Sequence, residues 1–278
     1  MKNLFKGFGI VAGIGIAVSI LMAIAMLTCK EAYTSTAGQY ISQTVSSIAL
    51  FGLSAWIGIK VIEKESVVHL TGLDKGLSRK TWIMLVGLAI AELPAVLFVE
   101  EWNENITLPQ TFAGVEVWLK MMEEQANAMM EMFINSDSIL RLILNIIVLA
   151  AIPAMIEELM FRGWIQRNLC KITNHHTAIW VTAFIFSAIH MQFYGFVPRM
   201  LLGAVLGYAY FYTKSLWGSI IIHFVNNTLA VIGGWLAYKG VMDEEMNVQA
   251  PIALASLAIS ITMIYYVYKY NHTEKTEK

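Results

Sequence analysis

The sequence predicts an all-α protein that crosses a membrane several times. Only 14% of its 278 residues are charged, whereas a soluble domain carries about 25%. Hydrophobic residues make up 57% of the chain, and the mean hydropathy is +0.60. The apolar residues also gather in long runs, and a helical span needs about 20 such residues.

Eight such runs follow one another along the chain. The first, 8–28, comes directly after Lys2 and Lys6. A signal peptide has an apolar core of about 7–15 residues, so we interpret this longer run as a retained first span. The others have these bounds: 45–62, 82–100, 138–160 or beyond, 177–195, 199–213, 215–238 and 250–268. The sixth is short, which predicts a half-span or a strongly tilted helix.

The basic residues predict the orientation of these spans. If the N-terminus is cytoplasmic, fourteen of the 19 lysines and arginines fall on the cytoplasmic side and four on the other. Cytoplasmic loops carry an excess of basic residues. We therefore expect about eight spans, both termini in the cytoplasm, and one multi-pass domain, 1–278, in the inner (plasma) membrane. A net charge of −1 gives no indication of nucleic-acid binding.

The longest loop, 101–137, would then lie outside the cell. It is acidic, and its apolar residues recur at helical spacing: Val115, Trp118, Met122, Ala126, Met129 and Phe133. This pattern predicts an amphipathic helix lying on the membrane surface. A lid over a site is the alternative.

Two adjacent acids stand in the fourth apolar run. Between Ile139 and Tyr238 the chain has only Glu157 and Glu158 as acids, in the segment "AMIEELMFRGWI". An ionisable group in a span costs about 2.5–3.5 kcal/mol or more, so it indicates a functional role by default. The alternative is a structural polar network that ties helices together.

Helical spacing gives the two acids different roles. Adjacent helical residues point about 100° apart, so Glu157 and Glu158 face different neighbours. Glu158 and Arg162 are spaced i, i+4 with the acid first, which favours an ion pair. Glu157 is left without a partner nearby in the sequence. Pro153, one turn earlier, predicts a kink.

Three further polar residues are predicted to lie about as deep in the membrane as Glu157, measured from the cytoplasmic side. If the fourth helix continues to about Leu169, Glu157 lies about 18 Å from its cytoplasmic end. In the fifth run His190 lies about 20 Å deep, and in the seventh His223 and Asn227 lie about 12 and 18 Å deep. We therefore expect the region 138–238 to form the catalytic core. His175 and His176 fall in a loop, "TNHHT", and are expected to be exposed.

These side chains fit hydrolysis by an activated water. A glutamate in an apolar cavity can act as a general base, a histidine can orient the water, and His223 and Asn227 can donate to an oxyanion. A metal site is the competing interpretation, because two histidines and a carboxylate can bind zinc. In that case the ligands would be Glu157, His190 and His223. The zinc-protease pattern H-E-x-x-H is absent, and the residues alone leave both interpretations open.

Three motifs carry a resemblance to a known family. The segments "EELMFR", "FSAIH" and "HFVNN" follow the patterns E-E-x-x-x-R, F-x-x-x-H and H-x-x-x-N, in that order. Over roughly 138–235 the chain resembles the type II CAAX prenyl endopeptidases and their bacterial relatives, the CPBP or Abi intramembrane proteases. Each motif alone is weak, but their combination in a multi-span protein is fairly specific.

The resemblance implies an intramembrane endopeptidase whose site opens to the cytoplasm. It implies that Glu157 and His190 activate water, that His223 and Asn227 form the oxyanion site, and that two further residues support them: Glu158 and Arg162. Family members have been described both as metalloproteases and as metal-free enzymes. We favour the metal-free mechanism and keep zinc as the alternative. The expected partners are the lipid bilayer and a peptide or protein substrate, with or without a lipid modification.

Two other function classes remain open at this stage. A non-enzymatic membrane scaffold or bacteriocin-immunity protein could retain the motifs for binding or packing. A transporter would also bury charges in the membrane, but transporters more often show internal repeats and broken helices, and the sequence shows neither. The substrate and the oligomeric state cannot be predicted from the sequence.

Overall fold

The chain folds into helices joined by short connections. The computed structural model describes residues 2–243 and 247–273, and this part of the chain contains no β-strand. The predicted all-α fold class is therefore confirmed. The α-helices are α1 (Lys2–Thr28), α2 (Lys30–Thr34), α3 (Thr36–Ser47), α4 (Ser54–Trp56), α5 (Val67–Thr71), α6 (Arg79–Ala91), α7 (Leu93–Glu104), α8 (Ala113–Ile134), α9 (Ile139–Asn145), α10 (Ile152–Glu158), α11 (Arg167–Leu169), α12 (His175–Ala188), α13 (Phe196–Thr213), α14 (Trp217–Tyr238) and α15 (Ala250–Thr273).

Several of these helices join into longer ones through π-helical turns. The segments Ile48–Leu53 and Ile57–Ile62 extend α3 and α4 into one helix. The segments Ile146–Ala151 and Leu159–Gln166 join α9, α10 and α11 into another. A 3₁₀ turn, Gln110–Phe112, precedes α8. π-Helical turns are frequent at functional sites, and the second pair flanks the two adjacent acids.

Six helices within the described residues are long and apolar enough to cross a membrane. They are Gly9–Thr28, Thr36–Ile62, Arg79–Glu104, Ile139–Leu169, Trp217–Tyr238 and Ala250–His272. They match six of the eight predicted runs, so the chain is a multi-pass membrane protein. The fourth helix continues to Leu169, as the depth argument required. The count of eight spans stays a prediction, because the fifth and sixth runs form shorter helices.

These two shorter helices, α12 and α13, form a hairpin that is packed among the others. With 14 residues α12 is about 21 Å long, less than the roughly 30 Å of a bilayer core. The predicted fifth span, 177–195, was therefore too long: α12 ends at Ala188, and Met191 adopts a left-handed conformation with φ 57°. His190 consequently lies in the turn after α12 and not within a helix.

The hairpin is tight because its facing residues are small. A Cβ added at Gly203 would lie 3.1 Å from the Cα of Ala183, and one at Gly207 would lie 2.8 Å from Ile179 Cγ2. Two small residues four positions apart favour such close packing of helices.

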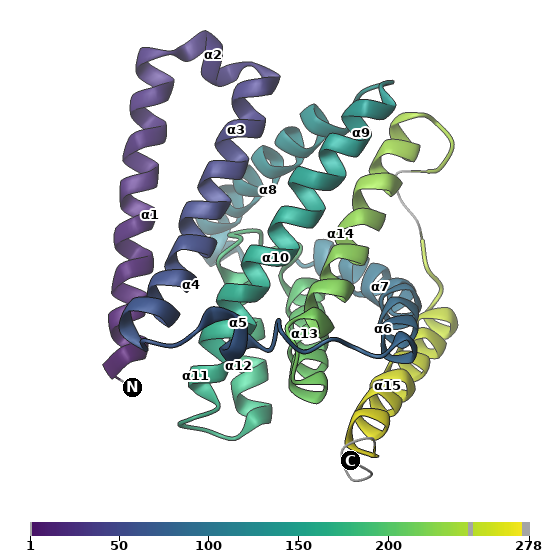
Figure 1. The fold of residues 1–278 in the computed structure, drawn as a ribbon. Helices are drawn as coiled ribbons and strands as arrows, with labels where there is room; N and C mark the ends of the chain where they lie inside the picture. The colour runs from purple at the N-terminus through teal and green to yellow at the C-terminus, as the bar shows by residue number, and fades with distance from the viewer. Residues whose placement is uncertain (1, 244–246, 274–278) are drawn as a thin grey trace.

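Figure 1 shows how the long helices are arranged. The start of α1 and the end of α15 lie at the same end of the molecule, together with the connection between α11 and α12. This arrangement is what both termini on one side of a membrane require. That this side is the cytoplasm stays a prediction.

The predicted amphipathic helix in 101–137 exists as α8, behind α9 in Figure 1. The six apolar residues that were predicted to form one face do not all face the same way. Met122, Ala126 and Phe133 face the protein, whereas Val115, Trp118 and Met129 are exposed. Glu116 and Glu123 are only partly exposed. The inward face of α8 is therefore partly polar, and much of its apolar surface faces outward.

The C-terminal end of α8 is held by the fourth long helix. Arg141 donates to the backbone oxygen of Met132, and Asn145 Nδ2 donates to that of Phe133 at 2.8 Å. The last carbonyls of a helix have no partner within it, so these contacts satisfy two of them. This explains why the apolar fourth run carries an arginine near its start.

Candidate active site

The candidate site is built where α10, the end of α12 and α14 meet. α14 packs against α10 and against the π-helical turn before it. Glu157 lies at the end of α10 with 7% of its surface exposed, and Glu158 and Arg162 are completely buried. The two adjacent acids therefore lie inside the protein and not at its lipid-facing surface.

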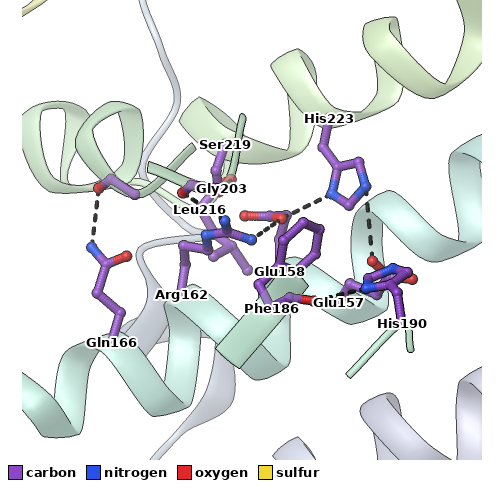
Figure 2. A network of polar contacts seen from close by, with 11 residues as sticks. Glu157, Glu158, Arg162, Gln166, Phe186, His190, Gly203, Leu216, Ser219 and His223 are labelled. Atoms are coloured by element: carbon purple, nitrogen blue, oxygen red, sulfur yellow. Dashed lines mark hydrogen bonds and ion pairs between the residues drawn. The ribbon is translucent and has the colours of Figure 1, made fainter. Parts of the chain in front are cut away.

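Glu158 binds two partners through one oxygen (Figure 2). Its Oε1 accepts from Arg162 Nη1 at 2.5 Å and from His223 Nδ1 at 2.8 Å. The predicted pair between Glu158 and Arg162 is confirmed. The contact with His223 is additional and joins α10 to α14. Arg162 also donates from Nη2 to the carbonyl oxygen of Gly203 at 2.8 Å, which ties the pair to α13.

Glu158 sets the orientation of the His223 ring. A carboxylate oxygen can only accept, so Nδ1 of His223 carries the hydrogen. In the neutral ring Nε2 then presents a lone pair, and it lies 3.8 Å from Glu157 Oε2. A carboxylate that fixes one nitrogen of a histidine and leaves the other for chemistry is a common arrangement. Glu157 and Glu158 thus face different nitrogens of one ring, as their different helical directions require.

His190 is fixed in the same way, but by the backbone. Its Nδ1 donates to the carbonyl oxygen of Phe186 at 2.7 Å, so its Nε2 also remains available. The Phe186 ring lies between the two histidines: the centroid distances are 5.1 Å to His190 and 5.8 Å to His223, both edge-on. Arg162 stacks on the same ring at 4.8 Å. Phe186 therefore acts as a common platform, and Figure 2 shows His190 at the Glu157 end of this network.

Asn227 lies one turn along α14 from His223 and has a weak contact of its own. Its Nδ2 lies 3.5 Å from the carbonyl oxygen of Leu149, the upper limit for a hydrogen bond. Leu149 is four residues before Pro153, and proline has no N–H to donate to that carbonyl. The proline thus frees an acceptor on the site side of the fourth helix. The oxyanion role of Asn227 stays a prediction.

The turn that carries His190 is held by Asn103, outside the three motifs, and by Ser187, at a variable position of the second motif. Asn103, at the end of α7, donates to the carbonyl of Phe193 and accepts from the N–H of Val197, both at 2.9 Å. Ser187 donates to the carbonyl of Phe196 at 2.6 Å. Irregular backbone at membrane depth requires such partners. The sequence analysis missed Asn103, because nothing in its local sequence distinguishes it from a loop residue.

The same turn connects the site to α8 and α13. Gln192, two residues after His190, donates to Glu123 of α8 at 3.1 Å and accepts from Arg199 of α13 at 3.0 Å. The sequence analysis did not connect Arg199 with the site. His175 and His176 lie at the start of α12 and take no part: His176 is exposed, and His175 stacks on Phe211 with centroids 4.4 Å apart.

The alternative of a zinc site concerns three of these side chains. Among the described residues, no three histidine, cysteine, aspartate or glutamate side chains are grouped so that they could hold a metal ion. The metal-free mechanism and the zinc site formed by Glu157, His190 and His223 both stay predictions. Glu158 Oε1 is already bound by Arg162 and His223.

Comparison with known proteins agrees with the motifs. Residues 139–229 match the family described as type II CAAX prenyl endopeptidase Rce1-like. The chain is also 24% identical over 180 residues to YdiL of Bacillus subtilis (strain 168), which is described as a candidate membrane peptidase. That match covers 60% of this chain and 74% of the relative. No solved structure matches the chain.

The family match contains all three motifs. It also contains α10, α12 and most of α14. The resemblance predicted from the motifs is confirmed. The chain is similar to membrane proteases, and its membrane-embedded polar site is the part that is similar.

Proposed function

We propose that this chain is an intramembrane endopeptidase of the CAAX type, in which Glu157 activates water for hydrolysis of a peptide bond. One observation carries the proposal. Glu158 is occupied by Arg162 and His223, whereas Glu157 accepts no hydrogen bond from any residue that the structure describes. Its carboxylate lies 3.8 Å from His223 Nε2, a separation that a bridging water can span.

In the proposed reaction Glu157 takes a proton from the water as the water oxygen attacks the carbonyl carbon of the substrate. The water's other hydrogen stays on its oxygen and donates a hydrogen bond to Nε2 of His190, which orients the water. The C=O π electrons move to the carbonyl oxygen, which becomes the oxyanion. The amide of Asn227 donates to this oxyanion. His223 can donate to it as well if it enters the reaction as the imidazolium, with Nδ1–H bound to Glu158 and a second hydrogen on Nε2. The C–N bond then breaks, and the proton on Glu157 passes to the leaving amine.

Glu158 and Arg162 support this reaction without contacting the substrate. Glu158 keeps Nδ1 of His223 occupied, so that Nε2 faces the reacting atoms. Arg162 balances the charge of Glu158 and joins the pair to the α12–α13 hairpin. A buried charge is tolerated when it is paired and hydrogen-bonded, and both conditions are met here.

The proposed setting is the inner (plasma) membrane, with the site open to the cytoplasm. The proposed substrate is a peptide or protein held at the bilayer, with or without a lipid modification. The family to which the chain is similar is described as prenyl endopeptidases, which supports a membrane-associated substrate for this chain. No metal is part of the proposed reaction.

The test is cleavage by the purified protein in liposomes, with a library of membrane-anchored peptides and mass spectrometry of the products. Glu157→Gln should lower the cleavage rate by about 10²–10⁴-fold, the usual contribution of a general base. The control is Glu124→Gln, the same change at an exposed acid of α8, which should cleave like the wild type. A chelator such as EDTA should leave the rate unchanged.

Three results would contradict the proposal. Full activity of Glu157→Gln would remove the catalytic role of this acid. Loss of activity with the chelator, restored by zinc, would replace the metal-free reaction by a metal-dependent one. Absence of cleavage by the wild type, with a biological phenotype that survives Glu157→Gln, would favour a scaffold or immunity protein.

A further inference from the structure

A third acid is buried in the membrane part of the protein, away from the motifs. Glu92 lies in the break between α6 and α7, inside the helical span Arg79–Glu104, with 3% of its surface exposed. Within the described part of the chain it forms no ion pair. The proposed reaction does not use it. An acid at such a position indicates a role by default.

The backbone around Glu92 is held in place by α15. Pro94 has no N–H, so the hydrogen-bond ladder is interrupted between α6 and α7. Ser256 bridges the interruption: its Oγ donates to the carbonyl of Ala91 at 2.5 Å and accepts from the N–H of Ala95 at 3.1 Å. Glu92 is thus presented from a fixed junction of three helices.

The contact that Glu92 makes is with α14. Its Oε1 accepts from Asn226 Nδ2 at 2.7 Å. Asn226 directly precedes Asn227 and lies three residues after His223, the residue bound to Glu158. Two hydrogen bonds from different helices therefore hold α14, one at His223 and one at Asn226. Their side chains point about 60° apart around the helix, which is enough to fix its rotation.

Asn227 has no strong contact that would do the same. Its contact with Leu149 is at 3.5 Å. A side chain at a radius of about 5–6 Å from the helix axis moves by about 1 Å when the helix turns by 10°. Misplacement of a reacting group by 1 Å can cost about a hundredfold in rate. The position of the Asn227 amide therefore depends on the hydrogen bonds at His223 and Asn226, which fix the rotation of α14.

We propose that Glu92 is a positioning residue for the candidate site. It holds Asn226, fixes the rotation of α14, and so keeps His223 and Asn227 aimed at the reacting carbonyl. This proposal rests on the proposed endopeptidase function. His223 and Asn227 are proposed to act on the oxyanion, which exists only after the attack. Displacement of these two side chains therefore lowers kcat and leaves KM nearly unchanged.

The chemistry of the contact provides a conservative variant. Among the residues that the structure describes, Glu92 Oε2 and Asn226 Oδ1 have no hydrogen-bond partner. A glutamine in place of Glu92 keeps the acceptor for Asn226 Nδ2 and adds a donor for the unpaired Oδ1. A leucine fills a similar volume but leaves Asn226 without an acceptor. The hydrogen bond, and not the charge, is what the proposal requires.

The experiment compares four variants of the full chain in liposomes, with kcat, KM and the thermal midpoint measured for each. Glu92→Leu and Asn226→Ala should lower kcat by about tenfold to a hundredfold, with KM within about threefold of wild type. Glu92→Gln should keep kcat within about threefold. Glu63→Gln is the control: it weakens the contacts that Glu63, outside the spans, makes with Arg167 and Asn168 and leaves Asn226 bound, so it should lower the thermal midpoint and not kcat.

The outcomes separate this proposal from the proposed function, with Glu157→Gln included in the series. If Glu157→Gln is inactive but Glu92→Leu and Asn226→Ala keep the wild-type kcat, the positioning role alone is wrong. It is also wrong if Glu63→Gln loses kcat in step with its thermal midpoint, or if Glu92→Gln loses as much kcat as Glu92→Leu. If Glu157→Gln is fully active, both proposals are wrong. If Glu92→Leu does not fold, Asn226→Ala decides.

Discussion

Removal of Glu158 alone should destabilise the protein more than removal of Glu158 together with Arg162. Both side chains are completely buried and lie 2.5 Å apart. Glu158→Leu leaves the guanidinium of Arg162 as an unpaired buried charge, which costs about 3–5 kcal/mol. In the double variant Glu158→Leu with Arg162→Met that charge is absent. What the double variant adds is the carbonyl of Gly203 without its donor, a loss of about 1–3 kcal/mol. Nδ1 of His223 loses its acceptor in both variants, so this loss cancels in the comparison.

The assay is the free energy of unfolding in mixed micelles, from denaturant titrations followed by circular dichroism. The double variant should be more stable than Glu158→Leu by about 2 kcal/mol, the difference between the two estimates. It should nevertheless be inactive, because His223 has lost the acceptor for Nδ1. The control is Glu116→Leu, which breaks a more exposed i, i+4 pair with Lys120 and should cause no measurable loss.

The reasoning would be refuted by two results. The first is a double variant whose loss of unfolding free energy equals the sum of the losses of Glu158→Leu and Arg162→Met measured singly, because the two charges would then not depend on each other. The second is a double variant with wild-type cleavage, because Glu158 would then have no part in orienting His223.

Two further predictions concern packing and pH. Gly207→Ala should destabilise the protein by about 1–3 kcal/mol, because its Cβ would lie 2.8 Å from both Gln166 Oε1 and Ile179 Cγ2; Gly13→Ala, with nothing within 4 Å, should not. Glu63 lies outside the spans. Burial acts to raise the pKa of Glu63, but hydrogen bonds from Asn168, Arg167 and Lys171 outweigh it and lower the pKa below its ordinary value of 4.5. The stabilisation is therefore present above pH 4.5 and disappears as the pH falls through the lowered value. Glu63→Gln should lower the thermal midpoint at neutral pH, and its difference from wild type should shrink in acid; a constant difference would contradict this.

The sequence predicted those parts of the site that depend on one helix. The ion pair of Glu158 with Arg162 and the separate direction of Glu157 follow from helical spacing alone, and the structure has both. The contact of Glu158 with His223 joins residues 65 positions apart. No local pattern specifies such a contact, because it depends on how α10 and α14 pack.

The helices of the structure differ from the predicted apolar runs at the positions where a helix bends or ends. The third predicted run, 82–100, bends at Glu92 because of Pro94, and the fifth ends at Ala188, before His190. Pro94 could have been recognised in the sequence as a cause of a kink. Glu92 could also have been recognised, since it is an acid in an apolar run. The hydrogen bonds of Asn103 with the His190 turn could not, because Asn103 resembles its loop neighbours and gains its partners only through the packing of α7.

The central claim is that α10, the turn after α12, and α14 build one site that activates one water. A double-mutant cycle of Glu157→Gln and His190→Ala, measured as kcat/KM for the cleaved peptide, tests it most directly. If both residues act on the same water, each single variant should lose about 10²–10⁴-fold. The kcat/KM of the double variant should then be less than about tenfold below that of the less active single variant, because the effects of residues that act as a unit do not add. Losses that multiply in the double variant would show that the two residues act independently, and would contradict the account.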